Sequence, residues 1–151
     1  MDILKVALFG HRDFCATREI EGKLYDILKD LMIKKSCLEI YIGRNGEFDL
    51  FAASVVKRIK KELDNSSCSM SLILPYKVKD IEYYKKYYDD IIIYENEEKL
   101  HPKSAITKRN EWMIENCDLL VCFIEHNSGG AYKAMRHAAK LGIKTINLFS
   151  F

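Results

Sequence analysis

A chain of 151 residues with 48% apolar and 11% aromatic side chains is long enough for one packed core and too short for two ordinary ones, so we expect a single domain over residues 1–151. No apolar run reaches the ~20 residues of a membrane span and no signal peptide is recognisable, which predicts a cytoplasmic protein without membrane contact. The 24 basic and 22 acidic residues are interspersed, which disfavours a dedicated nucleic-acid surface. The five cysteines lack CxxC spacing, which disfavours a disulfide framework or a zinc cluster.

The first half of the chain repeats a strand followed by a helix. Residues 3–9 form an apolar run typical of a buried strand, and residues 17–34 keep helical spacing with Thr17 as the N-cap. A second apolar run at residues 38–42 precedes a helix whose apolar stripe covers residues 52–63. This order indicates parallel strands joined by helices.

The middle of the chain continues the pattern less regularly. Residues 70–74 are predicted to form a third strand that Pro75 closes, because proline cannot donate to a central ladder. A tyrosine-rich segment at residues 81–88 has helical spacing, and residues 90–94 are predicted to form a short strand. Residues 95–103 are polar and are expected to form a loop.

The last third adds two helices and two strands. Residues 104–116 are predicted to be helical and residues 119–124 to form a buried strand. The pair Gly129–Gly130 opens a helix that Gly142 ends as its C′ residue, and residues 143–148 form the last strand. The fold predicted is therefore α/β, a Rossmann-like, doubly wound and mainly parallel sheet with helices on both faces.

Ligands of open parallel sheets bind beyond the carboxyl ends of the strands. Four predicted loops at those ends carry unusual residues, namely GHRDF at 10–14, GRNGEFD at 43–49, PY at 75–76 and EHNSGGAY at 125–132. The ligand site is expected where these loops meet.

Two features of these loops are suited to a phosphate group. Gly129 and Gly130 precede a helix whose free N–H groups and dipole form a seat for an anion, although such a pair is also an ordinary tight turn. Arg12, beside His11, can grip phosphate through two hydrogen bonds, and the alternative for both is a solvated turn.

Other residues have two interpretations each. Gly43 and Gly46 allow the backbone to approach a ligand, and Asp49 either caps the next helix or accepts from a ribose hydroxyl. Arg109 shares a helix face with Met113, where a surface arginine is the alternative.

The remaining histidines and the tyrosines are less specific indicators of a functional site. His101, His126 and His137 have no metal-ligand spacing, so no metal site is expected. The tyrosines of residues 83–88 could stack bases, but their helical spacing also suits half-buried packing. No GxSxG, Walker lysine loop, HExxH or GxGxxG motif occurs.

Taken in order, several motifs resemble the SLOG superfamily of Rossmann-like nucleotide-binding proteins, especially its YpsA-like branch. They are VALFGHRDF, GRNGEFDLFAA, LPY, KRNEWMIENCDLLVCF and the glycine pair with its helix, and together they span nearly the whole chain. The resemblance implies a pocket for a nucleotide or an ADP-ribose- or NAD-derived molecule, with no further cofactor required. The residues implied to line it are Gly10, His11, Arg12, Gly43, Gly46, Phe48, Asp49, Pro75, Tyr76, Arg109, Asn110, Ser128, Gly129, Gly130 and Tyr132.

The Lonely Guy phosphoribohydrolases of the same superfamily provide a residue-level comparison. Residues 109–113, RNEWM, are similar to their RKxxM motif. Their PGGxGTxxE motif is only partly present, because Ala131 replaces its threonine, Ala134 replaces its glutamate and no proline precedes Gly129. Alanine cannot act as an acid or a base, so this pocket resembles a binding site more than a hydrolase.

Three hypotheses follow from these observations. The first is a sensor or binding module for a nucleotide-like small molecule. The second is an enzyme that cleaves or transfers at a nucleotide N-glycosidic bond, with Arg109 as the clamp and Glu111 or Glu125 as the acid/base. The third is a protein-interaction or single-stranded DNA role, because the superfamily also resembles the DNA-processing protein DprA in its Rossmann core. The charge balance makes nucleic acid the weaker partner, and a homodimer is expected by analogy.

Overall fold

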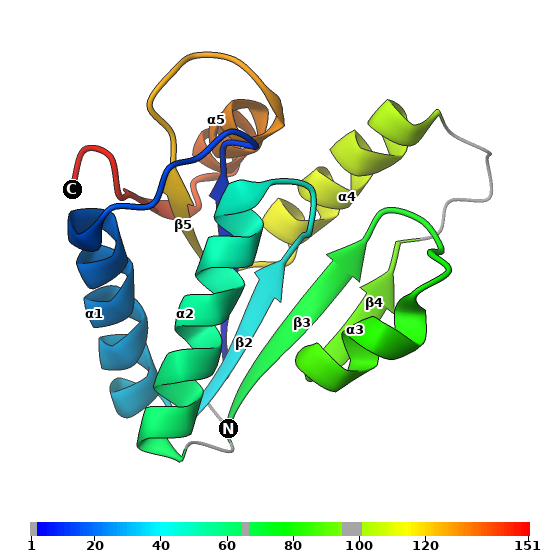
Figure 1. The fold of residues 1–151 in the computed structure, drawn as a ribbon. Helices are drawn as coiled ribbons and strands as arrows, with labels where there is room; N and C mark the ends of the chain where they lie inside the picture. The colour runs from blue at the N-terminus through cyan, green and yellow to red at the C-terminus, as the bar shows by residue number, and fades with distance from the viewer. Residues whose placement is uncertain (1–2, 65–66, 95–100) are drawn as a thin grey trace.

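The structure is a computed structural model that describes residues 3–64, 67–94 and 101–151. Strands and helices alternate along this part of the chain, as Figure 1 shows. They are β1 Ile3–Gly10, α1 Arg18–Lys34, β2 Cys37–Ile42, α2 Glu47–Leu63, β3 Cys68–Leu74, α3 Ile81–Tyr87, β4 Asp90–Ile93, α4 Pro102–Glu115, β5 Leu119–Phe123, α5 Gly130–Leu141 and β6 Lys144–Asn147. Most of the predicted loop at 95–103 lies outside the described residues.

One six-stranded sheet has the order β4-β3-β2-β1-β5-β6, and every neighbouring pair is parallel. The chain moves outward from β1 to β4 and then returns to place β5 on the other side of β1. The order therefore reverses between β1 and β5, and the loops after these two strands diverge to opposite faces. In open α/β sheets a ligand crevice forms at such a point.

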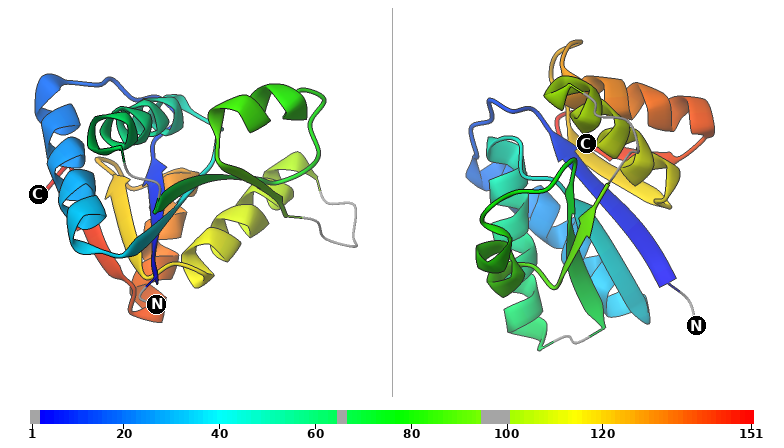
Figure 2. Two further views of the ribbon diagram at one scale, coloured as in Figure 1. Left: turned by 90° about the horizontal axis from the view of Figure 1, so that it is seen from below. Right: turned by 90° about the vertical axis from the view of Figure 1, so that its right-hand side faces the viewer.

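Helices cover both faces of the sheet, as predicted (Figure 2). Successive residues of β1 point to opposite faces, so Val6 and Leu8 pack with α1 and α2 while Ala7 and Phe9 pack with α4 and α5. The short α3 lies on the first face, where Tyr84 packs against the core. Because both faces are covered, the inner strands are apolar on both sides and read as continuous hydrophobic runs.

The ends of the helices follow local chemistry in most cases. Thr17 is the N-cap of α1, because its side chain accepts a hydrogen bond from the amide of Ile20 at 3.2 Å. Gly142 ends α5 with a φ of +72°, a conformation that favours glycine. The helix α4 begins at Pro102, so Lys103 belongs to it and not to the predicted loop.

No helix in the described ranges is both long and apolar enough to cross a membrane.

Candidate functional site

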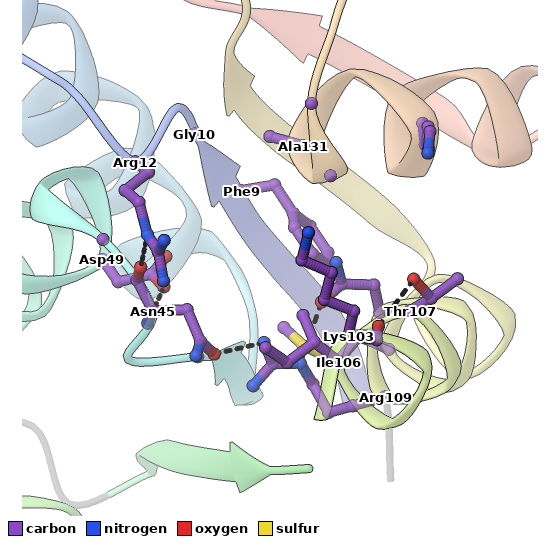
Figure 3. A pocket seen from close by; sticks show the side chains of 17 residues that line it. Phe9, Gly10, Arg12, Asn45, Asp49, Lys103, Ile106, Thr107, Arg109 and Ala131 are labelled. Atoms are coloured by element: carbon purple, nitrogen blue, oxygen red, sulfur yellow. Dashed lines mark hydrogen bonds between the residues drawn. The ribbon is translucent and has the colours of Figure 1, made fainter. Parts of the chain in front are cut away.

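The carboxyl ends of β1, β2 and β5 border a cavity of about 510 Å³ at the point where the strand order reverses (Figure 3). The end of β1, the loop after β2, one face of α4 and the first turn of α5 form its wall. The lining residues are Phe9, Gly10, Arg12, Gly43, Asn45, Gly46, Asp49, Lys103, Ile106, Thr107, Arg109, Asn110, Met113, Gly129, Gly130, Ala131 and Lys133. Four of these carry a positive charge and one carries a carboxylate, so the wall favours an anion.

Arg109 is the most buried charged group of this wall. The residue is only 2% exposed, and its guanidinium donates to Asn110 Oδ1 at 2.8 Å, to the carbonyl of Ile73 at 2.7 Å and to Asn45 Oδ1 at 2.5 Å. All three acceptors are uncharged, and no carboxylate lies within 4.0 Å of the guanidinium in the described part of the chain. Burial lowers the pKa of Arg109, although Asp49 opposes this effect.

The guanidinium thus has unused capacity. It carries five N–H groups, and three are used by these bonds. A buried cation without an ion pair is costly unless a partner arrives. The two remaining N–H groups of Arg109 would suit an anionic or oxygen-rich ligand.

The first turn of α5 presents a second group of hydrogen-bond donors to the cavity. Gly129 has a φ of +92°, which explains why glycine stands there, and the helix begins at the next residue with unpaired N–H groups. Asn110 is 8% exposed, and its Nδ2 lies 3.4 Å from the position that a Cβ would take at Gly130. Lys133 lines the cavity from the same turn. Backbone amides, a side-chain amide and an ammonium group together form a suitable seat for phosphate.

The loops after β1 and β2 are fastened to each other beside the cavity. The amide of Glu47 donates to the carbonyl of Arg12 at 2.9 Å, and Arg12 Nε donates to the carbonyl of Asn45, also at 2.9 Å. A Cβ at Gly46 would lie 2.5 Å from the Cα of Arg12, so a side chain at that position would force the loops apart. Arg12 is exposed, and among the described residues its guanidinium bonds only through Nε.

Asp49 supplies the carboxylate of the cavity wall. It is half-buried, and its Oδ2 accepts the amide of Asn45 at 3.0 Å. Burial raises the pKa of Asp49 to about 6, although the amide of Asn45 and the charge of Arg109 oppose the change. The N-cap of α2 is Gly46, and Asp49 caps the helix from its first turn by accepting the amide of Asn45, whereas a bond to a ribose hydroxyl stays a prediction.

His11 lies behind the cavity and supports it. The residue is 4% exposed, its Nε2 accepts the amide of Glu125 at 2.9 Å, and its ring stacks on His126 at 3.6 Å between centroids. Burial and the neighbouring His126 lower the pKa of His11, which favours the neutral ring that this acceptor role requires. His11 thereby holds the loop that leads into α5.

The structure brings most residues of the predicted set into the cavity wall. These are Gly10, Arg12, Gly43, Gly46, Asp49, Arg109, Asn110, Gly129 and Gly130. Their role in binding a ligand stays a prediction.

The other predicted residues lie outside this wall. Phe48 is fully buried beneath Gly10, where a Cβ would lie 2.1 Å from its ring, so its role is packing. Tyr76 is exposed but near enough to raise the pKa of Arg109. Ser128 contacts the ring of His126. The remaining members are His11, Pro75 and Tyr132.

The acid/base candidates of the enzyme hypothesis also lie outside the wall. Glu111 pairs with Lys108 at 3.7 Å, and Glu125 is exposed. Ala134, at the position of the hydrolase glutamate, is buried in the apolar core between the sheet and helices α4 and α5. Asp49 is the carboxylate that the described wall offers for proton transfer. In the described residues no group of three acidic, histidine or cysteine side chains could hold a metal ion.

Sequence reasoning missed several wall residues. Lys103, Ile106 and Thr107 recur at helical spacing on the face of α4 that contains Arg109 and Asn110, and extending that helix by two residues would have indicated Lys103. Asn45 gave no local signal, because its role depends on Arg109, 64 residues further along the chain.

No protein-family profile and no curated protein matches the chain significantly. Solved structures do resemble it. DNA processing protein A from Helicobacter pylori has a TM-score of 0.65 at 18% identity over 94% of this chain. The molybdenum cofactor binding protein from Rippkaea orientalis has a TM-score of 0.62 at 18% identity over 97% of this chain. DNA processing protein A from Streptococcus pneumoniae has a TM-score of 0.55 at 13% identity over 98% of this chain.

These comparisons establish the fold. The predicted Rossmann-like α/β architecture is confirmed, whereas the SLOG superfamily and its YpsA-like branch stay predictions. This chain spans 63% and 60% of the two DNA processing proteins and 77% of the molybdenum cofactor binding protein. At such low identity, a shared fold does not transfer a ligand or a reaction.

Proposed function

We propose that this protein binds a nucleotide or an ADP-ribose- or NAD-derived small molecule in the cavity, and that it acts as a sensor or binding module. Arg109 is the observation that carries this proposal. An arginine that is 2% exposed, lines the cavity and has only uncharged acceptors for its guanidinium is explained by a ligand that brings an anionic or oxygen-rich group. The free amides of the first turn of α5 and Lys133 support a phosphate on that ligand.

The binding experiment is calorimetric titration of the protein with AMP, ADP-ribose, NAD and cyclic ADP-ribose. We expect at least one of them to bind. Arg109→Met should weaken that binding by at least tenfold, since a hydrogen bond to a charged group contributes about 1.5–3 kcal/mol. The matched control is Arg58→Met, which removes an exposed arginine of α2 outside the cavity. Absence of binding by a folded protein, or unchanged binding by Arg109→Met, would refute the proposal.

Binding of single-stranded DNA is the second candidate function. The observation in its favour is the likeness over 94% of this chain to a DNA processing protein A whose structure is described with a single-stranded DNA binding mode. The same cations of the cavity wall would then contact backbone phosphates. Fluorescence anisotropy with a labelled oligonucleotide at increasing salt tests this role, because phosphate contacts must weaken steeply with salt.

A further inference from the structure

We propose that Asp49, together with Arg109, makes the cavity select nucleotides with free ribose hydroxyls over their deoxy analogues. This inference rests on the proposed binding function and names the specificity of the same site. Its starting point is the contrast between Asp49 and the rest of the wall, which carries positive charge on Arg12, Lys103, Arg109 and Lys133.

The carboxylate of Asp49 has unused hydrogen-bonding capacity. Its Oδ2 accepts the amide of Asn45 at 3.0 Å, and no lysine, arginine or histidine lies within 4.0 Å of it among the described residues. An ionised carboxylate offers about four acceptor positions, so most of them are available to a donor that enters the cavity. The bond to Asn45, just before α2, uses one of these positions, and no ion pair within the described residues uses the others.

The charge of Asp49 fixes the direction in which a nucleotide can bind. A phosphate beside Asp49 would meet a like charge in a partly dehydrated site, where repulsion is strong. The first turn of α5 has no such conflict, because Asn110 and Lys133 stand there with the free backbone amides. The phosphate is therefore assigned to α5, and a hydrogen-bond donor of the ligand is assigned to Asp49.

The position of Asp49 beside Arg109 indicates that the donor is a hydroxyl. A Cβ at Gly43 would lie 3.0 Å from an Nη atom of Arg109 and 3.2 Å from Asp49 Oδ2, so these two groups lie next to each other against the same glycine, and both line the cavity. A ligand group that reaches this part of the wall meets both side chains. Arg109 can only donate and an ionised Asp49 can only accept, whereas a hydroxyl does both. An ammonium group would meet the guanidinium as a like charge. Ribose carries two adjacent hydroxyls suited to this pair.

The test compares AMP with 2′-deoxy-AMP and 3′-deoxy-AMP by calorimetry. We expect wild-type protein to prefer AMP over at least one of the two by about tenfold or more, because each loses a hydrogen bond to a charged group. Asp49→Asn should reduce this preference to about twofold or less while it still binds the deoxy analogues. The matched control is Glu47→Gln, an acid of the same helix outside the cavity wall, which should keep the preference.

A second variant tests the position of these two side chains beside Gly43. Gly43→Ala places a methyl group against Arg109 and Asp49, and it should weaken the binding of AMP more than the binding of the deoxy analogues. The control is Gly22→Ala in α1, where the new Cβ would meet nothing within 4 Å; this variant should change the binding of neither AMP nor the deoxy analogues. Equal binding of AMP and both deoxy analogues by wild type, or an undiminished preference in Asp49→Asn, would overturn the inference and leave nucleotide binding intact. Absence of AMP binding by the folded protein would overturn the inference alone if ADP-ribose, NAD or cyclic ADP-ribose binds, and would overturn it together with nucleotide binding if none of the four binds.

Discussion

Replacement of the carboxylate in the cavity wall by its amide should stabilise the fold at neutral pH. The pKa of Asp49 rises from its usual 3.8 to about 6 because the group is buried, so the ionised form is held at a cost. A difference of about two pKa units corresponds to about 3 kcal/mol, which is an upper limit because the group is only half-buried. Asp49→Asn keeps an oxygen for the amide of Asn45 and removes this cost.

The pH dependence gives the sign of the effect. The folded state binds its proton more tightly than the unfolded chain, so the cost is absent below pH 3.8 and complete once the pH has risen above about 6. Urea unfolding of wild type and Asp49→Asn between pH 4 and 8 should show an advantage of the variant that grows by about 1–3 kcal/mol over this range. A variant that is less stable at pH 7, or a difference that does not change with pH, would refute the reasoning.

Three further changes test the support of the site. Gly10→Ala should destabilise the protein by about 2 kcal/mol or more in urea unfolding, because the new Cβ would lie 2.1 Å from the ring of Phe48. Because burial lowers the pKa of His11, the unfolded chain binds a proton at this residue more tightly than the folded protein does. The free energy of unfolding of wild type should therefore fall as the pH falls below 6.5, and His11→Gln should lack this decrease. Thr17→Ala should lower the free energy of unfolding by about 1 kcal/mol in urea unfolding, because it removes the side-chain hydrogen bond of the N-cap of α1.

Each of these results has a counterpart that would contradict it. If Gly10→Ala is due to the clash, Phe48→Leu should reduce its cost when the two are combined, and simple addition of the two costs would exclude that cause. An identical pH dependence in wild type and His11→Gln would show that His11 does not titrate as described. A Thr17→Ala variant as stable as wild type would mean that the hydrogen bond to Ile20 contributes nothing.

The fold was predictable because its signals are local. Apolar runs such as residues 38–42 read as buried strands on their own, and glycine at a helix end, as at Gly142, needs no knowledge of the rest of the chain. The start of α4 was placed two residues late, since Lys103 is polar and follows Pro102 in a polar stretch. Proline in the first turn is compatible with a helix, which explains the earlier start.

The site was predictable only in part, because its contacts join distant segments. The loop order placed Gly10 and Gly129 at one edge of the sheet, but the burial of Arg109 follows from its bonds to Asn45 and Ile73 on two other strand ends. A surface arginine was the alternative for this helix position, and local spacing gives no reason to reject it. His11 shows the reverse case, because a residue in a ligand-facing loop packs behind the cavity.

The most direct test of nucleotide binding is a titration of ¹⁵N-labelled protein with AMP followed by amide NMR. The account predicts that the amides of Gly130 and Ala131 in the first turn of α5 shift together with the Nε resonance of Arg109, and that Arg109→Met abolishes the shifts at low AMP concentration. Shifts confined to the tyrosines of α3, or an absence of shifts at millimolar AMP, ADP-ribose, NAD and cyclic ADP-ribose in turn, would contradict it.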